Sequence, residues 1–453
     1  MTEALFGTDG YRGTVNDLQE TGINPSTFEQ LAAVYTNLVT ERTGEPPTII
    51  VGSDTRVSSP ALREAVCMGA ASAGAEVWDL DVAPTPVIAW LAQEHSVNAI
   101  AITASHNPAS DNGFKPFDVG GMKPGRETLE EIEKRYFEDK ERFSGKGRII
   151  PRPDLKEEYL KRTVEALGGN EVLAGHTVII DGANGAVHEL APRLYKRLGA
   201  EVYKFACEND GTRINKGNGA AHLEGVIDFM DHNPSLTRAD GFLGAFASDG
   251  DGDRVMGVDR LGRIVNGNHW MHQLAHKQIG IVGTIYTNSA LRNAVEEMGV
   301  EFHVCDNGDS YVTARLQELT RERGSGYTRG GEFTGHLIDL HHLSSGDGLY
   351  MGAWLAIRAA QEDAGLADIR DMLNLWPEKM ESLRVNGADA KALVAKCVVQ
   401  DAISAARGRL DKRGSVIVRP SGTEPLVRVW AEAEDGELLP DIIKSISQAL
   451  QAA

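Results

Sequence analysis

The chain has 453 residues, of which 42% are hydrophobic and 25% are charged, and its formal net charge is -19. These fractions are ordinary for a globular protein, and the length predicts about three domains. The acidic charge argues against nucleic acid and anionic membrane surfaces as partners, because both repel a negatively charged chain. A site for an anionic substrate would therefore have to gather arginine and lysine locally.

The four cysteines are scattered along the chain and form no C-x-x-C pair. Such usage is typical of a reducing cytosol. The first residues, MTEALFGTDG, lack the basic and apolar segments of a signal peptide, and no apolar run is long enough to span a bilayer. We therefore expect a cytoplasmic protein.

A strand–helix–strand pattern occurs three times along the chain. Each unit has an apolar strand, an amphipathic helix and a second strand that opens after a glycine cap. The first strands are TIIVG, TVIID and TIYTN; the helices are Pro60–Ser72, Val187–Leu198 and Leu291–Met298; the junctions are AGAEVW, LGAEVY and MGVEFH. The repetition predicts an α/β fold with three similar mixed α/β domains.

The last part of the chain has a different pattern. SVIVRPSGTEPLVRVWAEAE predicts two strands around a polar loop, and a helix is expected from about Asp441 to Leu450. This order predicts a smaller C-terminal α+β domain. The expected domains are residues 1–150, 151–257, 258–370 and 371–453.

A serine and a histidine follow the apolar strand Ala99–Ile102, in the stretch TASHNP. A hydrolytic serine would need a general base and an oxyanion hole, and the chain contains no G-x-S-x-G elbow. If the strand continued, His106 would project to the face opposite Ser105 and would be a poor base for it. The alternative is a serine that caps a turn before Asn107 and Pro108.

Three aspartates alternate with glycines in SDGDGDR, after the apolar run GFLGAFA. Asp249, Asp251 and Asp253 would repel one another strongly unless a cation lay between them. Carboxylate oxygens without histidine or cysteine favour Mg²⁺ or Mn²⁺ over zinc. An EF-hand is excluded because its later ligands are missing. The alternative is a solvated acidic turn.

The loop RPSGTEP, residues 419–425, offers an arginine, two hydroxyls and a glycine amide, and Arg428 follows shortly after. Such a set could hold a phosphate. The alternative is an ordinary hairpin turn, and the loop does not match a Walker A motif, which is absent from the chain.

Two further loops contain polar residues that could face a ligand. In GGEFTGH, the alternating Glu332, Thr334 and His336 would share one face of an extended segment and could bind sugar hydroxyls. In GTDGYRG, Arg12 lies in a glycine-rich turn, and Lys115 follows ten residues after Ser105. Either cation could also be an ordinary surface charge.

TASHNP, SDGDGDR, GGEFTGH and RPSGTEP occur in this order and resemble the four signature loops of the α-D-phosphohexomutases, and GTDGYRG also matches. The resemblance covers nearly the whole chain. Within that superfamily, the chain is most similar to the phosphoglucosamine mutase branch. The segments that carry this similarity are DGANGAVHELAPRLYKRLGAEV, NDGTRINKGNGAAHLEGV and RPSGTEPLVRVWAE. The resemblance implies four domains around a central cleft.

The resemblance also implies an activity. It is the interconversion of glucosamine 6-phosphate and glucosamine 1-phosphate, through a phosphoserine enzyme and a 1,6-bisphosphate intermediate. The implied cofactor is Mg²⁺, with a hexose 1,6-bisphosphate as activator. The implied partner is a small-molecule sugar phosphate, and a homodimer is possible.

Family resemblance further assigns roles to residues. Ser105 would be carried as phosphoserine, and its phosphate would hold Mg²⁺ together with Asp249, Asp251 and Asp253. The phosphotransfer site would be lined by His106, Lys115 and Arg12. The sugar would be bound by Arg254, Glu332, Thr334 and His336. The second phosphate would be bound by Arg419, Ser421, Gly422, Thr423 and Arg428. The proton acceptor is left open among Arg12, Lys115 and a nearby histidine.

Four positions depart from the amino-sugar pattern: Phe333 and Thr334 replace Gln and Ser, Ser310 replaces Arg, and Pro420 replaces a common Lys. Phe333 supports an alternative, a phosphomannomutase/phosphoglucomutase acting on mannose or glucose phosphates. Two other classes are a sugar-phosphate sensor without activity and a metal-dependent phosphatase. The complete set of serine, aspartates and lysine argues against the sensor, and a phosphatase would release inorganic phosphate rather than isomerise the sugar phosphate.

Overall fold

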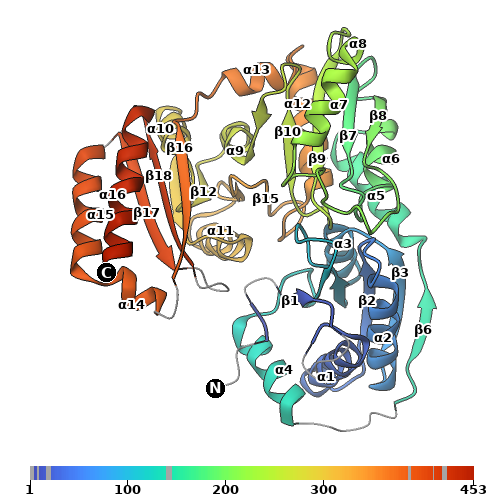
Figure 1. Ribbon diagram of the computed structural model, residues 1–453. Coiled ribbons are helices and arrows are strands. Elements are labelled where there is room, and N and C mark those ends of the chain that lie inside the picture. The colour runs from blue at the N-terminus through green and yellow to red at the C-terminus, as the bar shows by residue number, and fades with distance from the viewer. Residues whose placement is uncertain are drawn as a thin grey trace. The chain divides into compact units, whose positions relative to one another are not determined.

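The computed structural model describes residues 5–7, 10–16, 22–138, 145–385, 389–411, 413–420 and 426–453. The chain divides into two compact units (Figure 1). The first comprises Met1–Tyr286 and Val300–Met372, and the second comprises Thr287–Gly299 and Leu373–Ala453.

The first sheet of the first unit has the strand order β1-β5-β4-β2-β3-β6. Its strands are β1 (Tyr11–Thr14), β2 (Thr48–Ser53), β3 (Glu76–Val82), β4 (Asn98–Ile102), β5 (Asp111–Phe117) and β6 (Arg148–Pro151). The helices of this region are α1 (Pro25–Thr43), α2 (Ser59–Ser72), α3 (Thr85–His95) and α4 (Arg126–Glu138).

Helices cover both faces of this sheet. Ile49 of β2 belongs to an apolar cluster with Phe28 of α1 and Leu62 of α2. Gly52 points to the other face, where a Cβ would lie 2.8 Å from Cδ1 of Ile88 in α3. Because side chains alternate along a strand, α1 and α2 lie on one face and α3 on the other. This explains why β4 is buried along its whole length.

Two more sheets complete the described part of the first unit, with orders β11-β10-β9-β7-β8 and β13-β12-β14-β15. The elements of the five-stranded sheet region are α5 (Leu155–Ala166), β7 (Thr177–Asp181), α6 (Leu190–Arg197), β8 (Glu201–Phe205), α7 (Glu224–His232), α8 (Pro234–Thr237), β9 (Phe242–Ser248), β10 (Val255–Val258) and β11 (Ile264–Val265). Those of the four-stranded sheet region are α9 (Gly267–Ala275), β12 (Gly280–Thr284), β13 (Glu301–Cys305), α11 (Asp309–Arg323), β14 (Arg329–Gly331) and β15 (Leu337–Asp339). The chain continues in α12 (Gly348–Gln361), which packs against β9 and β10 of the five-stranded sheet, and in α13 (Leu366–Asp371), which contacts α12, α9 and β9.

The three predicted strand–helix–strand units are present. In each, the two strands pair in parallel: β2 with β3, β7 with β8, and β12 with β13. The glycines that precede the second strands, Gly74, Gly199 and Gly299, all have positive φ, the conformation that ends a helix at little cost in glycine. The predicted mixed α/β fold class is confirmed.

One predicted strand was misplaced. TIYTN contributes only Thr284 to β12, which begins earlier, at Gly280. The strand ends there because Thr284 pairs with Cys305, the last residue of β13. Asn288 then accepts a hydrogen bond from the backbone N–H of Ala290 and caps the next helix.

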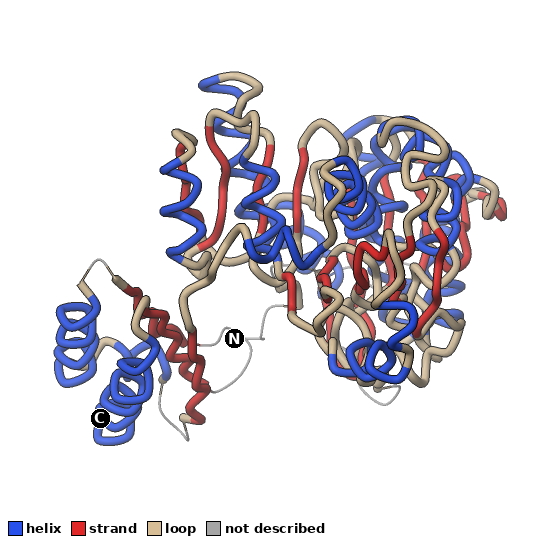
Figure 2. The backbone as a smooth tube through the Cα atoms, turned by 90° about the horizontal axis from the view of Figure 1, so that it is seen from above, coloured by secondary structure: helices blue, strands red, loops and turns tan. Residues whose placement is uncertain are grey.

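The second unit contains a three-stranded sheet of order β16-β18-β17. Its elements are α10 (Ser289–Glu297), β16 (Glu378–Arg384), α14 (Ala390–Val394), α15 (Cys397–Leu410), β17 (Gly414–Pro420), β18 (Leu426–Ala433), the short 3₁₀ helix η1 (Gly436–Leu438) and α16 (Leu439–Ala452). Figure 2 shows its strands in red beside helices in blue. The predicted strand pair and final helix are confirmed, whereas β16 was not predicted, because its mostly exposed residues form no apolar alternation.

The four domain boundaries stay predictions. β6 ends at Pro151, and β11 of the five-stranded sheet lies at Ile264–Val265, beyond the boundary expected near residue 257. No helix in the described part of the chain is long and apolar enough to cross a membrane.

A buried carboxyl anchors a long loop to the end of β7. Asp181 accepts hydrogen bonds from the backbone N–H groups of Ala183 at 2.9 Å and Gly219 at 2.7 Å. Burial raises the pKa of Asp181 to about 7, although both N–H groups favour the charged form. The loop that ends at Gly219 is therefore tied to the sheet through a group that titrates near neutral pH.

We predict that this group makes stability fall with rising pH. Unfolded aspartate has a pKa of about 3.9, so between about pH 4 and the folded pKa the native chain binds a proton that the unfolded chain does not. The Asp181→Asn variant lacks this titration. Urea unfolding should therefore show wild type losing stability relative to the variant as pH rises from about 4 to 7. A pH-independent difference would contradict the prediction.

Candidate active site

Ser105 lies at the end of the buried strand β4, in a strained backbone conformation. Its φ is +52°, and only 1% of the residue is exposed. Its Oγ donates a hydrogen bond to Oδ2 of Asp249 at 2.6 Å, and its backbone N–H donates to Oγ1 of Thr103 at 2.8 Å. A left-handed conformation at a non-glycine residue persists only where surrounding contacts enforce it.

Arg56 supplies much of this enforcement. Its Nη2 donates to the carbonyl oxygens of Ser105 and Asn107, both at 2.9 Å. Its Nη1 donates to the carbonyl oxygens of Asp111, at 3.0 Å, and Pro108. One fully buried guanidinium thus binds four carbonyls of the serine loop.

Asp54 compensates the charge of Arg56. Its Oδ2 accepts from Nε of Arg56 and from Oγ1 of Thr103, both at 2.8 Å, while its Oδ1 accepts from Oγ of Ser59 at 2.7 Å. Sequence reasoning missed Arg56 and Asp54. The available signal was the polar stretch Ser53-Asp-Thr-Arg at the end of an apolar strand, the same signal that selected Ser105.

The three predicted metal ligands converge in the loop after β9. Oxygen atoms of Asp249, Asp251 and Asp253 lie within 4.8 Å of one another, and all three residues are buried. Burial, followed by the charges of Asp253 and Asp251, raises the pKa of Asp249 to about 8. Gly250 allows close approach to the serine loop, because a Cβ there would lie 2.6 Å from the carbonyl oxygen of Ser105.

This cluster fits a hard divalent cation. Oδ1 of Asp251 is buried and has no hydrogen-bond partner among the described residues, so an oxygen ligand is available where water is excluded. In the described ranges, these aspartates are the only group of three or more side chains that could hold a metal. An all-oxygen set suits Mg²⁺.

Lys115 of β5 reaches the same cluster from the first sheet. Its Nζ lies 2.7 Å from Oδ2 of Asp251 and 3.4 Å from Oδ2 of Asp253, and only 1% of the residue is exposed. Arg12 lies on the neighbouring strand, β1, paired antiparallel with Gly113 of β5. The two predicted cations therefore come from adjacent strands, two residues apart in register.

His336 joins the aspartates to the predicted sugar loop. Its Nε2 lies 3.0 Å from Oδ1 of Asp253, and its Nδ1 lies 2.8 Å from Oε2 of Glu332. Burial alone would lower the pKa of His336, but Asp253 reverses the effect and raises it to about 10. Arg254 adds a further side chain to this series of contacts, because its Nε lies 3.4 Å from Nε2 of His336. Thr334 is half-buried in the same loop.

The position of His106 corrects one expectation. Its Nδ1 lies 3.4 Å from Oγ of Ser105. The imidazole is therefore next to the serine hydroxyl, whereas a continued strand would have placed the two side chains on opposite faces. The reason is that β4 ends at Ile102 and the chain turns through the positive φ of Ser105. Burial, followed by the charges of Arg254 and Arg12, lowers the pKa of His106 to about 3, so the imidazole is neutral at neutral pH.

The predicted phosphate loop lies in the second unit. Arg419 of β17 pairs directly with Arg428 of β18, so their side chains leave the same face of the sheet. Ser421, Gly422 and Thr423 lie outside the described residues.

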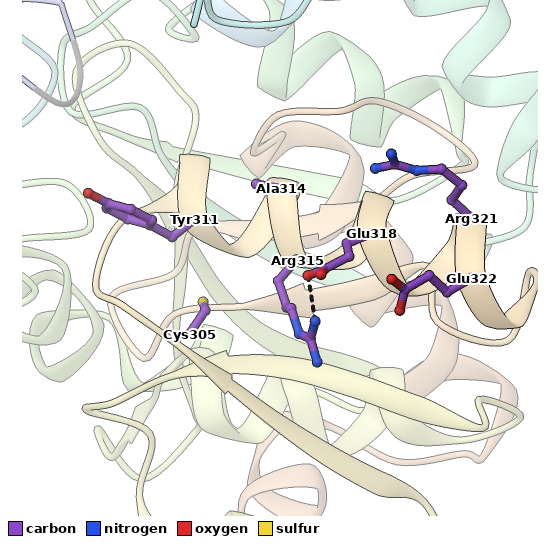
Figure 3. A pocket seen from close by; sticks show the side chains of 7 residues that line it. All are labelled: Cys305, Tyr311, Ala314, Arg315, Glu318, Arg321 and Glu322. Carbon is purple, nitrogen blue, oxygen red and sulfur yellow. Dashed lines mark hydrogen bonds and ion pairs between the residues drawn. The ribbon is translucent and has the colours of Figure 1, made fainter. Parts of the chain in front are cut away.

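Three pockets are found in the described part of the first unit, and two of them bear on the position of the site. One, of about 560 Å³, is lined by Lys115 and by Ser310, the position that departs from the amino-sugar pattern, together with Lys123 and Asp309. The second, of about 480 Å³, follows α11 beside Cys305 (Figure 3). Its lining contains none of the predicted site residues, so we take the first as the pocket next to the active site.

The chain matches three models of one family, described as Phosphoglucomutase/phosphomannomutase: domain I over residues 3–143, domain III over 262–376 and the C-terminal domain over 378–449. A phosphoglucosamine mutase of Thermus thermophilus is 37% identical over 462 residues and covers 99% of both chains. That of Rhodococcus opacus is 36% identical and covers 96% of both. The chain belongs to the phosphoglucosamine mutase branch of the phosphohexomutases. The predicted family membership is thus confirmed.

Solved structures agree with this family on the fold. A phosphoglucomutase/phosphomannomutase family protein from Burkholderia thailandensis superposes with a TM-score of 0.80, at 24% identity, over 100% of this chain and 98% of that one. An Aspergillus fumigatus N-acetylphosphoglucosamine mutase, solved with GlcNAc-6P and magnesium, superposes with a TM-score of 0.69 at 15% identity, over 99% and 95% of the chains. Both likenesses concern the phosphohexomutase fold.

We predict that Arg56→Met destabilises this phosphohexomutase by about 3–5 kcal/mol, because it leaves the buried carboxylate of Asp54 without its cation. Arg63→Met is the matched control. Arg63 pairs with the more exposed Asp79 and Asp81, so its loss should cost about 1 kcal/mol or less. Urea unfolding of both variants measures the difference. Equal losses would show that the serine loop does not depend on Arg56.

Proposed function

We propose that this protein interconverts glucosamine 6-phosphate and glucosamine 1-phosphate, with Ser105 as the phosphoryl carrier. The proposal rests on one observation above all: the hydroxyl of Ser105 is buried and lies 2.6 Å from a carboxylate of the aspartate cluster. Full-length relatives that are phosphoglucosamine mutases support the choice of sugar.

The reaction takes place in two transfers. In the first, the bond between phosphorus and Oγ of Ser105 breaks, the phosphoryl group bonds to the free hydroxyl oxygen of the sugar monophosphate, and the proton of that hydroxyl ends on Oγ of Ser105. The resulting 1,6-bisphosphate turns in the site, the bond between its other phosphorus and the sugar oxygen breaks, that phosphoryl group bonds to Oγ of Ser105, and the serine proton ends on the freed sugar oxygen. Atoms balance without water or an oxidant, and the product is the isomeric monophosphate.

The surrounding charges suit this transfer. Phosphoserine and sugar phosphate each carry about -1.5 to -2 charges at neutral pH, and phosphoryl transfer depends mainly on positioning and neutralising such charge. Lys115 brings a buried ammonium to the cluster, and Arg12 lies on the next strand. His106, with its pKa lowered to about 3, is neutral beside Ser105 and can accept a hydrogen bond.

Asp249, Asp251 and Asp253, with the phosphate on Ser105, would hold Mg²⁺. When bound, the ion withdraws charge from the phosphoryl oxygens and balances the carboxylates. A hexose 1,6-bisphosphate would act as activator by phosphorylating Ser105 where it is not yet phosphorylated.

The sugar would be held by the loop that contains Glu332, Thr334 and His336, with Arg254 beside it. His336 is charged and fixed between Asp253 and Glu332, so it can donate only where these bonds allow. In the second unit, Arg419 and Arg428 flank a loop that we assign to phosphate binding, through Ser421, Gly422 and Thr423.

The cellular location and the oligomeric state are the last parts of the proposal. All four cysteines are free thiols, which suits the cytoplasm, and we place the activity there. A homodimer stays a prediction.

We expect Ser105→Ala to abolish mutase turnover while leaving unfolding by urea little changed, because only the carrier hydroxyl is lost. Ser110→Ala is the control: Ser110 is exposed in the same loop. Coupled assays with glucosamine, glucose and mannose phosphates give the rates, and intact mass gives the phosphoryl group. Near-normal turnover by Ser105→Ala would refute the carrier role. Preference for mannose or glucose phosphate would favour the phosphomannomutase/phosphoglucomutase alternative.

The metal site has its own test. Mg²⁺ should stabilise wild type against heat, by about 2.7 kcal/mol at a concentration of 100 times its Kd. Asp251→Asn replaces an oxygen without a partner, so it should fold but lose most of this gain. Asp259→Asn, at a buried carboxylate that bonds its own turn, should keep the gain. Retention of the full Mg²⁺ shift by Asp251→Asn would place the ion elsewhere.

A further inference from the structure

A second side chain reaches the serine loop, from the loop that follows β8. Asn215 is 6% exposed, and its Nδ2 donates to the carbonyl oxygen of Ser105 at 2.8 Å and to that of Asn107 at 3.2 Å. Ser105 and Asn107 lie 110 and 108 positions away from Asn215 in the sequence. The contact therefore joins the loop of one sheet to that of another.

Asn215 and Arg56 bind the same two carbonyls. Nη2 of Arg56 donates to the oxygens of Ser105 and Asn107 as well, so each oxygen receives one donor from its own sheet region and one from the neighbouring one. A carbonyl oxygen has two lone pairs and can accept both. Rotation of the Ser105 peptide would break two hydrogen bonds at once.

Asn215 is itself held in place. Its backbone N–H donates to the carbonyl oxygen of Ala183 at 3.1 Å, and its φ is +55°, a conformation that asparagine tolerates better than most residues. Gly219, which ends this loop, donates to Asp181 at the end of β7. The donor that faces Ser105 is thus fixed to a strand end and is not a mobile side chain.

We propose that Asn215 is a positioning residue for phosphoryl transfer, an inference that rests on the function proposed above. It holds the Ser105 carbonyl, so that the strained backbone keeps Oγ on the aspartate cluster. It acts through Ser105 and needs no contact with the sugar. Its removal should therefore slow the chemical step and leave sugar binding unchanged.

Asn218 provides a matched comparison. It is also 6% exposed, and its Nδ2 likewise donates to two carbonyls. Those carbonyls belong to Arg213 and Lys216 of its own loop. Asn218 therefore shares the burial and bonding of Asn215 but has no link to the serine.

The experiment compares Asn215→Asp with Asn218→Asp. At position 215 the change keeps the side-chain shape and the tolerance of positive φ. It replaces the donor Nδ2 by a carboxylate oxygen, which faces two carbonyl oxygens and cannot donate to them. We expect kcat to fall by about 100-fold, the cost of a misplaced reacting group, with KM for the sugar phosphate unchanged. Asn218→Asp should keep kcat near wild type. Asn215→Gly, which permits the same φ and adds no charge, should also lower kcat while KM stays constant.

Hydrogen exchange in the metal-free, substrate-free enzyme separates this inference from the proposed function. Backbone amides of residues 103–111 should exchange faster in Asn215→Asp and Asn215→Gly than in wild type or Asn218→Asp. Equal exchange and equal kcat in the two aspartate variants would overturn the proposal. If wild type itself shows no mutase turnover, the proposed function fails, and the exchange rates alone decide whether Asn215 holds the loop.

Discussion

The structure of the first unit depends on the neutralisation of three buried carboxyl groups. Asp249, Asp251 and Asp253 lie too close together to be charged at the same time without nearby cations. Lys115 supplies one from the first sheet, and His336 supplies another from the hairpin of β14 and β15. The site is therefore the point at which three sheets contribute charge. Their packing is coupled to the chemistry, because moving one sheet away would leave a buried charge without a partner.

The serine loop is constrained in a complementary way, through backbone carbonyls. Arg56 and Asn215 both bind the carbonyls of Ser105 and Asn107, and Asp54 balances the guanidinium. These bonds stabilise the positive φ of Ser105, the residue whose hydroxyl donates a hydrogen bond to Asp249. Phosphoryl transfer gains most from positioning, and the carrier role proposed for Ser105 would account for the amount of buried hydrogen bonding that orients this residue.

The sequence was informative about strand ends and uninformative about long-range contacts. TASHNP and SDGDGDR each follow an apolar strand, a local pattern, and both lie where that pattern predicts. Arg56 and Asn215 were missed, because they meet Ser105 across 49 and 110 residues, and no periodicity encodes such a pairing. TIYTN was misplaced for a related reason: β-branched and aromatic residues favour a strand, but the ladder with the partner strand ends at the pair Thr284 and Cys305.

The loop that contains Glu332 and His336 has two strongly held side chains on either side of a less constrained one. Glu332 and His336 are fixed, because one accepts from the N–H of Gly308 and the other bonds Asp253. The backbone carbonyl of Phe333, between them, accepts a hydrogen bond from the N–H of Gly267 at 3.0 Å. Its half-buried ring instead contacts Tyr286, with centroids 6.4 Å apart. Under the proposed function, a substitution at position 333 would therefore change contacts to the sugar and leave the charge network around Asp253 intact.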